Sequence, residues 1–384
     1  MKKILILLTS ILLVFPSFVY AKQEENTNLN LTPNATSAIL MEYSTGKIIY
    51  NKDANKISSV ASLTKMMGLI IAMETIENKG LKYNDIITVS ENAKGMGGTQ
   101  LYLDTGEKIS VDDLLKGIVM ASANDAMVAL AERIAGTEEE FVRLMNEKAK
   151  EIGLKNTHFK NCVGFDEEEH YSTAYDMAII AKELLKHEEI LKYSSVYESY
   201  IRENTDNKTW VVNTNKLVRF YEGADGLKTG WTEKAGSSLA ATAKKGDLRL
   251  IAVTLGYEKS NIRNQETMNL LDYGFNQYNA KKLYKKGDVV GHTSIDKSSI
   301  DKIDLVLEDD VITINKKTDK DIKYKYDIEL NNISLPIKKK DKLGVFILKD
   351  NENNIISKTN LISKDNINRI SFSKLYLKTL QESL

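Results

Sequence analysis

The chain has 384 residues, of which 42% are hydrophobic, so it is long enough for one full-sized core and a second, smaller domain. Its 53 basic side chains balance 53 acidic ones, and the formal net charge is therefore zero. A neutral chain with neither zinc-finger spacing nor an aromatic RNA-binding signature is not expected to bind nucleic acid.

The first 21 residues have the pattern of a secretory signal peptide. Lys2 and Lys3 precede an apolar run over 4–15, and residues 19–21 end in the small residue Ala21, which is typical of a cleavage site. A membrane anchor or a buried helix is the alternative, but the run is shorter than the roughly 20 residues that a membrane span needs. We therefore expect cleavage near Ala21 and export of the mature protein.

A polar linker rich in Asn and Thr is predicted for residues 22–37. Two strands follow, at Ala38–Tyr43 and Lys47–Asn51, and a Ser-Thr-Gly turn joins them into a hairpin. The next element is a helix from Ser62 through Glu77, which we expect Gly80 to end in a left-handed conformation.

The middle of the chain is predicted to be helical, because three helix starts fit the capping-box spacing of a hydroxyl and a carboxylate three residues apart. These pairs are Ser110 with Asp113, Thr137 with Glu140, and Thr173 with Asp176. Their acids are expected to cap helices rather than to act in catalysis. The acidic run 166–169 beside His170 is likewise expected to be a solvated loop rather than a metal site.

Strand patterns return in the second half of the chain and are followed by another helix. The strands are predicted at Gly226–Trp231, Ser238–Ala243 and Arg249–Leu255, and the helix at Asn261–Tyr278. Strands at both ends of residues 38–280, with helices between them, indicate an α+β domain in which an antiparallel sheet is flanked by helices and carries a helical insert.

Residues 285–365 consist of short β-rich segments separated by charged turns, which indicates a small all-β domain. The last segment, 366–384, is predicted to be an amphipathic helix, with Phe372, Leu375 and Tyr376 on its apolar face. Such a helix could lie on a membrane surface or pack on the β domain, and both interpretations stay open.

Cysteine and histidine chemistry is sparse. Cys162 is the only cysteine, so no disulfide can form within the chain, and nothing near it in the sequence indicates an activated thiol. The four histidines have no paired ligand spacing: His158, His170, His187 and His292. We therefore expect neither a metal nor a cofactor.

Ser62 and Lys65 are three residues apart, a spacing that brings a hydroxyl and an amine to the same face of a helix. A desolvated lysine with a lowered pKa could accept the serine proton, and the positive end of the helix dipole would favour the developing negative charge. The motif alone is weak, because the same Ser-x-x-Lys pattern also begins at Ser44, Ser294, Ser299 and Ser371.

Two downstream motifs distinguish Ser62 from Ser294, Ser299 and Ser371, whereas Ser44 lies in the predicted Ser-Thr-Gly turn. Ser122-Ala123-Asn124 lies where one predicted helix ends and another begins, so it could present a hydroxyl and an amide to the same pocket, although a plain helix break is the alternative. Lys228-Thr229-Gly230 occurs once, at the predicted start of a strand. A cation and a hydroxyl there suit a substrate carboxylate, and Gly230 allows another chain to approach closely.

In this order, the three motifs resemble those shared by penicillin-binding proteins and class A β-lactamases. Five longer segments resemble the low-molecular-mass D-alanyl-D-alanine carboxypeptidases: Ala61–Met67, Ala121–Ala126, Asn156–Phe159, Tyr171–Ala178 and Gly223–Gly230. The likeness runs from about Ala38 to Tyr278, and the β-rich part also resembles that family's usual tail. It implies a β-lactamase/transpeptidase-like fold for residues 38–280.

The resemblance also implies roles for the motif residues. Ser62 would attack the carbonyl between the two terminal D-alanines of a peptidoglycan stem peptide, with Lys65 as its base. Ser122 and Asn124 would relay protons and orient the peptide.

In the same resemblance, Lys228 and Thr229 would hold the terminal carboxylate of the peptide. Gly230 would leave room for the peptide beside the strand. The backbone amides of Ser62 and Trp231 would bind the oxyanion, and water would then hydrolyse the acyl-enzyme. Trp231 stands where some members of the family carry His.

The resemblance further implies that β-lactam antibiotics inhibit the protein covalently, and that it works at the outer face of the cytoplasmic membrane or in the cell wall. A β-lactamase is the nearest alternative, but the chain has no Glu-x-x-Leu-Asn pattern for rapid deacylation. A transpeptidase, which uses a peptide amine instead of water, and a non-catalytic wall-binding scaffold are two further alternatives.

Overall fold

The computed structural model describes residues 29–319 and 322–371. A five-stranded antiparallel sheet forms the centre of the first part, in the order β2-β1-β9-β8-β7. Its strands are β1 Ser37–Glu42, β2 Ile48–Lys52, β7 Ala224–Thr232, β8 Gly236–Lys245 and β9 Leu248–Tyr257. The strands come from both ends of this part, as predicted, and β7 forms one edge of the sheet.

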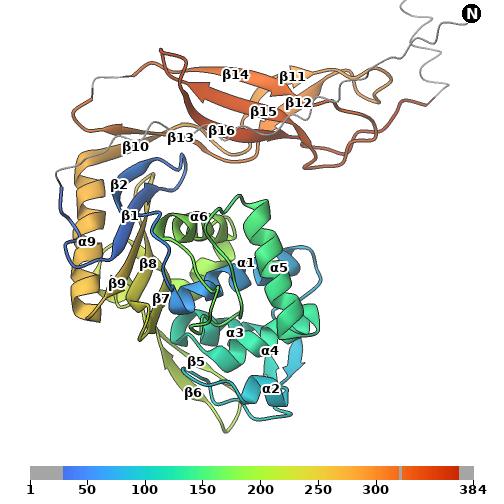
Figure 1. Ribbon diagram of the computed structural model, residues 1–384. Helices are drawn as coiled ribbons and strands as arrows, with labels where there is room; N and C mark the ends of the chain where they lie inside the picture. The colour runs from blue at the N-terminus through green and yellow to red at the C-terminus, as the bar shows by residue number, and fades with distance from the viewer. Residues whose placement is uncertain (1–28, 320–321, 372–384) are drawn as a thin grey trace, which may run out of the picture.

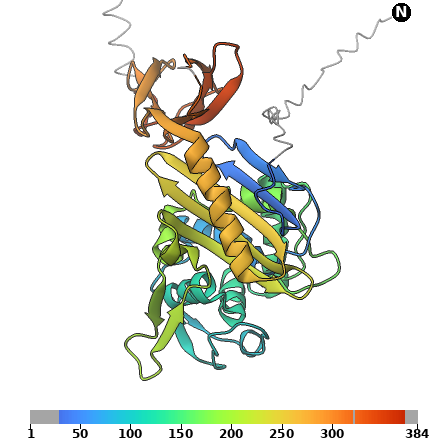
Figure 2. The ribbon, with the colours of Figure 1, turned by 90° about the vertical axis from the view of Figure 1, so that its left-hand side faces the viewer.

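Helices cover both faces of this sheet, with α9 lying across one face and the helical insert on the other (Figures 1 and 2). The main helices are α1 Lys65–Glu77, α3 Val111–Lys116, α4 Asn124–Ala135, α5 Glu138–Glu151, α6 Ala174–Leu184 and α9 Ser260–Gln277. Shorter helices are α2 Glu91–Lys94, α7 Leu191–Ser194 and α8 Leu217–Phe220, with the 3₁₀ turns η1 Ala61–Thr64 and η3 Glu188–Ile190 and the π-helical turn η2 Gly117–Ala121. Two hairpins complete the insert: β3 Ile86–Thr88 with β4 Lys108–Ser110, and β5 Glu198–Ile201 with β6 Thr209–Val212.

The alternation of side chains along β1 explains why the sheet is covered on both faces. Ile39 and Met41 are buried in the core shared with the helical insert, whereas Leu40 is buried in the core beneath α9. Each such side chain contributes roughly 1.5–3 kcal/mol on burial. Gly274 lets α9 approach closely, because a Cβ there would lie 2.9 Å from Leu40 Cδ2.

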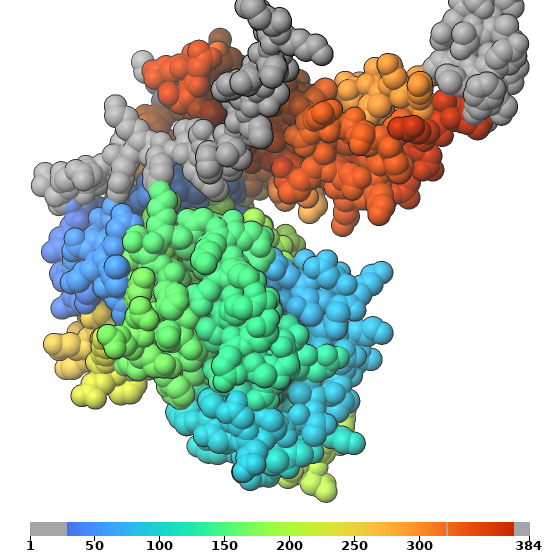
Figure 3. Space-filling view, turned by 45° about the vertical axis from the view of Figure 1, so that its right-hand side comes forward, coloured from blue at the N-terminus to red at the C-terminus, as the bar shows by residue number. Residues whose placement is uncertain are grey.

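The β-rich part follows α9 directly and lies across one end of the first part (Figures 1 and 3). β10 Tyr278–Tyr284 pairs with β13 Val311–Lys316, and five other strands form an antiparallel sheet in the order β11-β12-β16-β15-β14. These are β11 Val289–Thr293, β12 Ile303–Leu307, β14 Lys325–Leu330, β15 Lys342–Lys349 and β16 Ile355–Ile362. The predicted α+β architecture with a following all-β part is therefore confirmed.

Several local predictions need correction. The predicted helix from Ser62 begins as the 3₁₀ turn η1, and it ends with Lys79, not Gly80, in the left-handed region at a φ of 62°. The Lys-Thr-Gly motif lies in the second half of β7 rather than at a strand start. Each of the three predicted hydroxyl caps accepts from the expected backbone amide.

The ends of the chain also differ from their predictions where they are described. Within the predicted linker, Thr32 and Ala35 are buried, and Asn34 Nδ2 donates to Glu266 Oε1, because this segment packs beside α9. The predicted terminal helix is wrong for 366–371, where Ile367 and Arg369 form isolated β-bridges.

The predicted signal peptide, residues 1–21, and the remainder of the predicted terminal helix, residues 372–384, lie outside the described residues. None of the helices within 29–319 and 322–371 is long and apolar enough to cross a membrane.

Candidate active site

Ser62 and Lys65 meet at the N-terminal end of α1. Ser62 lies in the turn η1 and Lys65 is the first residue of the α-helix, so Lys65 Nζ donates to Ser62 Oγ at 2.8 Å. The buried amine also donates to Asn124 Oδ1 at 2.7 Å and to the Val163 carbonyl at 2.8 Å. The three acceptors fix the amine beside the serine hydroxyl.

Burial determines the protonation of this lysine. Loss of solvent lowers the pKa of Lys65 to about 7, although the nearby Cys162 and Asp125 act in the opposite direction. An ordinary lysine remains protonated at neutral pH, whereas an amine with a pKa near 7 is partly free to accept a proton. Lys65 can therefore act as a base toward Ser62.

Asn124 and Ser122 lie on the opposite wall, where the π-helical turn η2 gives way to α4. Asn124 directs its Oδ1 toward Lys65, because its Nδ2 donates to the Gly97 carbonyl at 2.7 Å. Ser122 is nearly buried and has a left-handed φ of 67°. No hydrogen bond joins its hydroxyl to Ser62 or Lys65 among the described residues.

Gly230 on β7 packs directly against the turn that holds Ser62. A Cβ at this glycine would lie 3.0 Å from Ser62 N and 2.9 Å from the Val60 carbonyl oxygen, so no side chain fits without movement. The close approach places the Lys-Thr-Gly motif beside Ser62, although the two are far apart in the sequence. Trp231 follows with 68% of its surface exposed.

Lys228 is a second buried amine, and it lies close enough to Lys65 to feel its charge. Burial lowers the pKa of Lys228 well below its usual range, and the positive charges of Lys65 and Arg263 add to the effect. Its Nζ donates to the Thr229 carbonyl at 3.0 Å, and the Thr229 hydroxyl donates to Thr214 Oγ1 at 2.8 Å. A bound carboxylate would stabilise the protonated amine, so the site suits an anionic ligand.

The loop that contains Val163 was missed as part of the site. Asn161 Oδ1 accepts from the backbone amides of Val163, Gly164 and Phe165, at 3.3, 2.7 and 3.0 Å. This side chain shapes the turn that presents the Val163 carbonyl to Lys65. The available signal was an Asn three residues before a Gly, a combination typical of turns.

Arg263 was also missed, because only the fold brings its charge near Lys228. It projects from α9, and its Nη1 donates to Ser237 Oγ at 2.9 Å and to the Ser238 carbonyl at 3.1 Å. These serines on β8 are the register partners of Trp231 and Gly230. Its positive charge therefore lies directly behind the Lys-Thr-Gly strand.

The other candidate residues have structural roles. Cys162 is buried, and burial together with Glu138 raises the pKa of its thiol well above the usual value, so it is no nucleophile. Burial lowers the pKa of His170 to about 4, and its neutral ring bridges Thr64 and the Lys160 amide. Within the described ranges, no three His, Cys, Asp or Glu side chains are placed to hold a metal ion.

Known proteins match the chain along most of its length. Residues 22–259 match the family described as D-alanyl-D-alanine carboxypeptidase, and residues 278–369 match the C-terminal domain of penicillin-binding protein 5. The D-alanyl-D-alanine carboxypeptidase DacF of Bacillus subtilis is 43% identical over 383 residues, which cover 99% of this chain and 98% of that relative.

Solved structures show the same similarity. Penicillin-binding protein 5 from Haemophilus influenzae superimposes with a TM-score of 0.68 at 28% identity, covering 88% of this chain and 98% of that one. Penicillin-binding protein D2 from Listeria monocytogenes, in its ampicillin-bound form, has a TM-score of 0.57 at 30% identity, covering 63% of this chain and 98% of that one. The chain belongs to the D-alanyl-D-alanine carboxypeptidase family.

Proposed function

We propose that Ser62 is the residue through which this D-alanyl-D-alanine carboxypeptidase is acylated by the end of a peptidoglycan stem peptide. The observation that carries the proposal is the 2.8 Å contact from Lys65 Nζ to Ser62 Oγ, made by a buried amine whose pKa is about 7. Lys65 accepts the hydroxyl proton while Oγ attacks the carbonyl carbon of the penultimate D-alanine.

The tetrahedral intermediate needs donors for its oxyanion. The backbone amides of Ser62 and Trp231 are suited to this role, since Gly230 brings the β7 edge against the Ser62 turn. As the intermediate collapses, the C–N bond breaks and the terminal D-alanine leaves with the proton returned by Lys65, helped by Ser122. Water then attacks the ester and releases the shortened peptide, with Ser62 restored.

The Lys228 and Thr229 side chains are proposed to bind the terminal carboxylate of the peptide. A buried lysine that lies close to two other cationic side chains gains from an anionic ligand, which supports this assignment. All of these groups lie within residues 38–280, which we regard as the catalytic domain, and the second domain would span 285–365.

β-Lactams are proposed to acylate the same serine. A β-lactam presents the carbonyl of its strained amide to Ser62 and its carboxylate to Lys228 and Thr229, the groups proposed to bind the peptide. The Listeria relative, which is similar in fold, has been solved in an ampicillin-bound form, and this supports the proposal.

The site of action is proposed to be the cell wall or the outer face of the cytoplasmic membrane, after removal of a signal peptide near Ala21. The C-terminal segment 372–384 is proposed to bind the membrane surface. The buried Ile367 bridges to Ile337, so a deletion that spares the β sheet should begin after Ser371. This deletion should move the protein to the soluble fraction, and unchanged fractionation would exclude the anchor.

Penicillin labelling tests the central proposal. The wild type should be labelled covalently by a fluorescent penicillin, Ser62→Ala should be unlabelled, and Lys65→Ala should react far more slowly. Release of D-alanine from a peptide ending in D-Ala-D-Ala is the second measurement. Labelling of Ser62→Ala would refute the assignment, and labelling without D-alanine release would favour the scaffold alternative.

A further inference from the structure

Asn124 is held by a loop that belongs to neither of its neighbouring helices. Residues 97–107, which we name the Gly97 loop, supply two carbonyl acceptors: Gly97 O binds Asn124 Nδ2 at 2.7 Å, and Thr99 O binds Asn124 N at 2.7 Å. A Cβ on Gly98 would lie 2.8 Å from Asn124 Nδ2, so the contact is close. The loop therefore determines which end of the amide faces Lys65.

Asp125 holds the loop from one side. Its buried carboxylate accepts from the amide of Leu101, at 3.0 Å to each oxygen, and from the amide of Leu103 at 3.1 Å. Tyr102 between them has a left-handed φ of 57° and is 81% exposed. Such a conformation is unfavourable for a tyrosine unless its surroundings enforce it.

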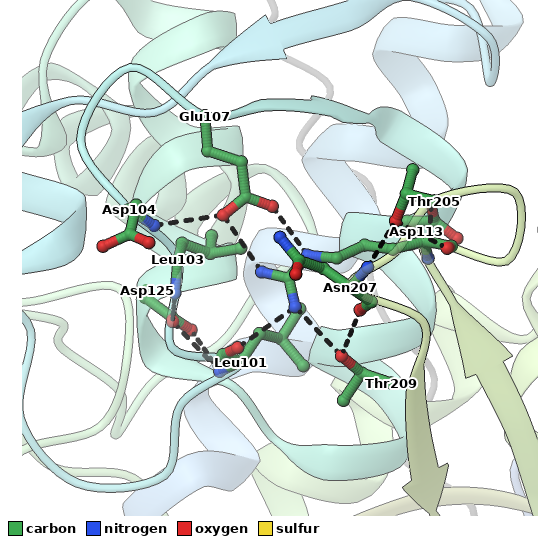
Figure 4. Close-up of polar contacts among 10 residues, drawn as sticks. Leu101, Leu103, Asp104, Glu107, Asp113, Asp125, Thr205, Asn207 and Thr209 are labelled. Atoms are coloured by element: carbon green, nitrogen blue, oxygen red, sulfur yellow. Dashed lines mark hydrogen bonds and ion pairs between the residues drawn. The ribbon is translucent and has the colours of Figure 1, made fainter.

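Arg202 holds the same loop from the other side. It extends from the end of β5, and its Nε and Nη2 donate to the two carboxylate oxygens of Glu107, at 2.6 and 3.1 Å. Its Nη1 donates to the Leu101 carbonyl at 3.4 Å and to Thr209 Oγ1 at 3.2 Å. Figure 4 shows Glu107 and Leu101 of the loop on one side of these contacts and Thr209 of the β5–β6 hairpin on the other.

The segment after this hairpin contacts the Lys-Thr-Gly strand on the other side of the site. Beyond β6 the chain reaches Thr214, whose hydroxyl accepts from Thr229 of the Lys-Thr-Gly motif. The Thr214 amide donates to the Met120 carbonyl, two residues before Ser122, at 3.0 Å. Through the hairpin, Arg202 therefore connects the loop that holds Asn124 to the segment that contacts Thr229.

We propose that Arg202, through its bidentate ion pair with Glu107, is a positioning residue that keeps Asn124 aligned with Lys65. Arg202 touches neither Ser62 nor Lys65, and the inference rests on the proposed function of those two residues. Planar two-point pairing fixes direction as well as distance, which a single charge cannot do. Only 11% of the Arg202 side chain and 20% of the Glu107 side chain are exposed, so water competes little.

The test compares Arg202→Met with a matched control. Arg249 on β9 pairs with Asp225 on β7 at nearly the same side-chain exposure, 12% and 21%, so Arg249→Met removes a similar ion pair from the central sheet instead of from the insert. Stopped-flow acylation by a fluorescent penicillin is measured for both full-length variants, with the melting temperature as a check on folding. We expect acylation to slow roughly tenfold in Arg202→Met and less than twofold in Arg249→Met.

Two further readouts separate positioning from loss of stability. The amides of Leu101 and Leu103 should exchange with solvent roughly tenfold faster in Arg202→Met only. The acid limb of its pH–rate profile should move to lower pH, because protonated Lys65 loses the Asn124 acceptor and its pKa falls. If Arg202→Met does not fold, Glu107→Gln should show the same changes at smaller size. The double variant that exchanges the pair, Arg202→Glu with Glu107→Arg, should be acylated faster than either of its single variants.

Unchanged acylation and unchanged amide exchange in a folded Arg202→Met protein would overturn the inference. An equal loss in Arg249→Met, or an exchanged pair slower than both single variants, would overturn it as well. Failure of the proposed function is distinguishable, since Ser62→Ala would then still be labelled while the amide exchange of the Gly97 loop continued to report on Arg202.

Discussion

The lowered pKa of Lys65 predicts how acylation depends on pH. Only the neutral amine can accept the Ser62 proton, so the rate should follow the neutral fraction of a group with a pKa of about 7. That fraction is about 9% at pH 6 and about 91% at pH 8. Acylation should therefore accelerate about tenfold between these two values and change little above pH 8.

Single-turnover mixing with a fluorescent penicillin measures this rate directly, because it isolates acylation from hydrolysis of the acyl-enzyme. Burial lowers the pKa of His170 to about 4, so this residue stays neutral across the window and cannot produce the rise. Lys65→Arg provides the second control, since a guanidinium remains protonated throughout and should leave only residual labelling.

A rate that is flat or falling from pH 6 to pH 8 would refute the role of Lys65 as the base. A rise centred near pH 9 or above would instead show that burial desolvates this amine less than the structure indicates. The midpoint of the profile therefore tests the electrostatics, and the loss of the profile in Lys65→Arg tests the assignment.

Four further outcomes follow from the packing and the charges. Gly230→Ala should slow penicillin acylation at least tenfold, because the new Cβ would clash with Ser62 N and the Val60 carbonyl oxygen. A wild-type rate would show that β7 can move away from the Ser62 turn without loss of activity. Thr173→Ala should lower the free energy of unfolding by about 1 kcal/mol in urea titrations, through loss of its cap to the Asp176 amide, and no loss would contradict the cap. Phe346→Ala should lower the free energy of unfolding of the β-rich part by about 3–5 kcal/mol, while penicillin still labels Ser62. Loss of labelling would show that the two parts of the chain are coupled. Between pH 7 and 10.5 the unfolded state keeps more protons on Lys65 than the folded state, so Lys65 should contribute up to about 5 kcal/mol to a rise in stability with pH. The pKa of Lys228 is lowered as well, so Lys65→Met should reduce the rise without abolishing it, and an unchanged rise would contradict the lowered pKa of Lys65.

The local elements were predictable because their patterns are short. The β1–β2 hairpin, the caps of α3, α5 and α6, and the paired long strands β8 and β9 all lie within two residues of their predicted positions. Hydroxyl caps and strand alternation depend on neighbouring residues, which is why the sequence pattern suffices for them. The ends of β8 and β9 differ from the prediction by one or two residues, because both strands are longer in the structure than their sequence patterns.

Order along the chain, together with the predicted turn at Ser44, was enough to select Ser62. Five serines begin a Ser-x-x-Lys motif, and three of them, Ser294, Ser299 and Ser371, follow the Ser122-Asn124 and Lys228-Gly230 motifs. Ser44 precedes both motifs but lies in the turn between β1 and β2, whereas Ser62 leads into a helix. The structure places Ser62, Lys65 and Asn124 in one hydrogen-bonded group, with Gly230 packed against it.

Residues that act from a distance were not predictable. Asn161 contributes by shaping a turn, Arg263 by placing charge behind a strand, and Arg202 by linking a hairpin to a loop 95 residues away. None of them belongs to a motif whose spacing predicts its partner. Their roles follow from contacts between segments that only the folded chain brings together.

The sequence by itself determined the order of the elements, the α+β class, the family resemblance and the identity of the candidate nucleophile, because each depends on local pattern or on motif order. The tertiary structure decided the electrostatics and the alignment of the pocket. Lys65 has its lowered pKa only because it is fully buried, and Asn124 faces it only because the Gly97 loop occupies the other end of its amide. Desolvation and hydrogen-bond direction are properties of the packed chain, and no spacing along the sequence contains them.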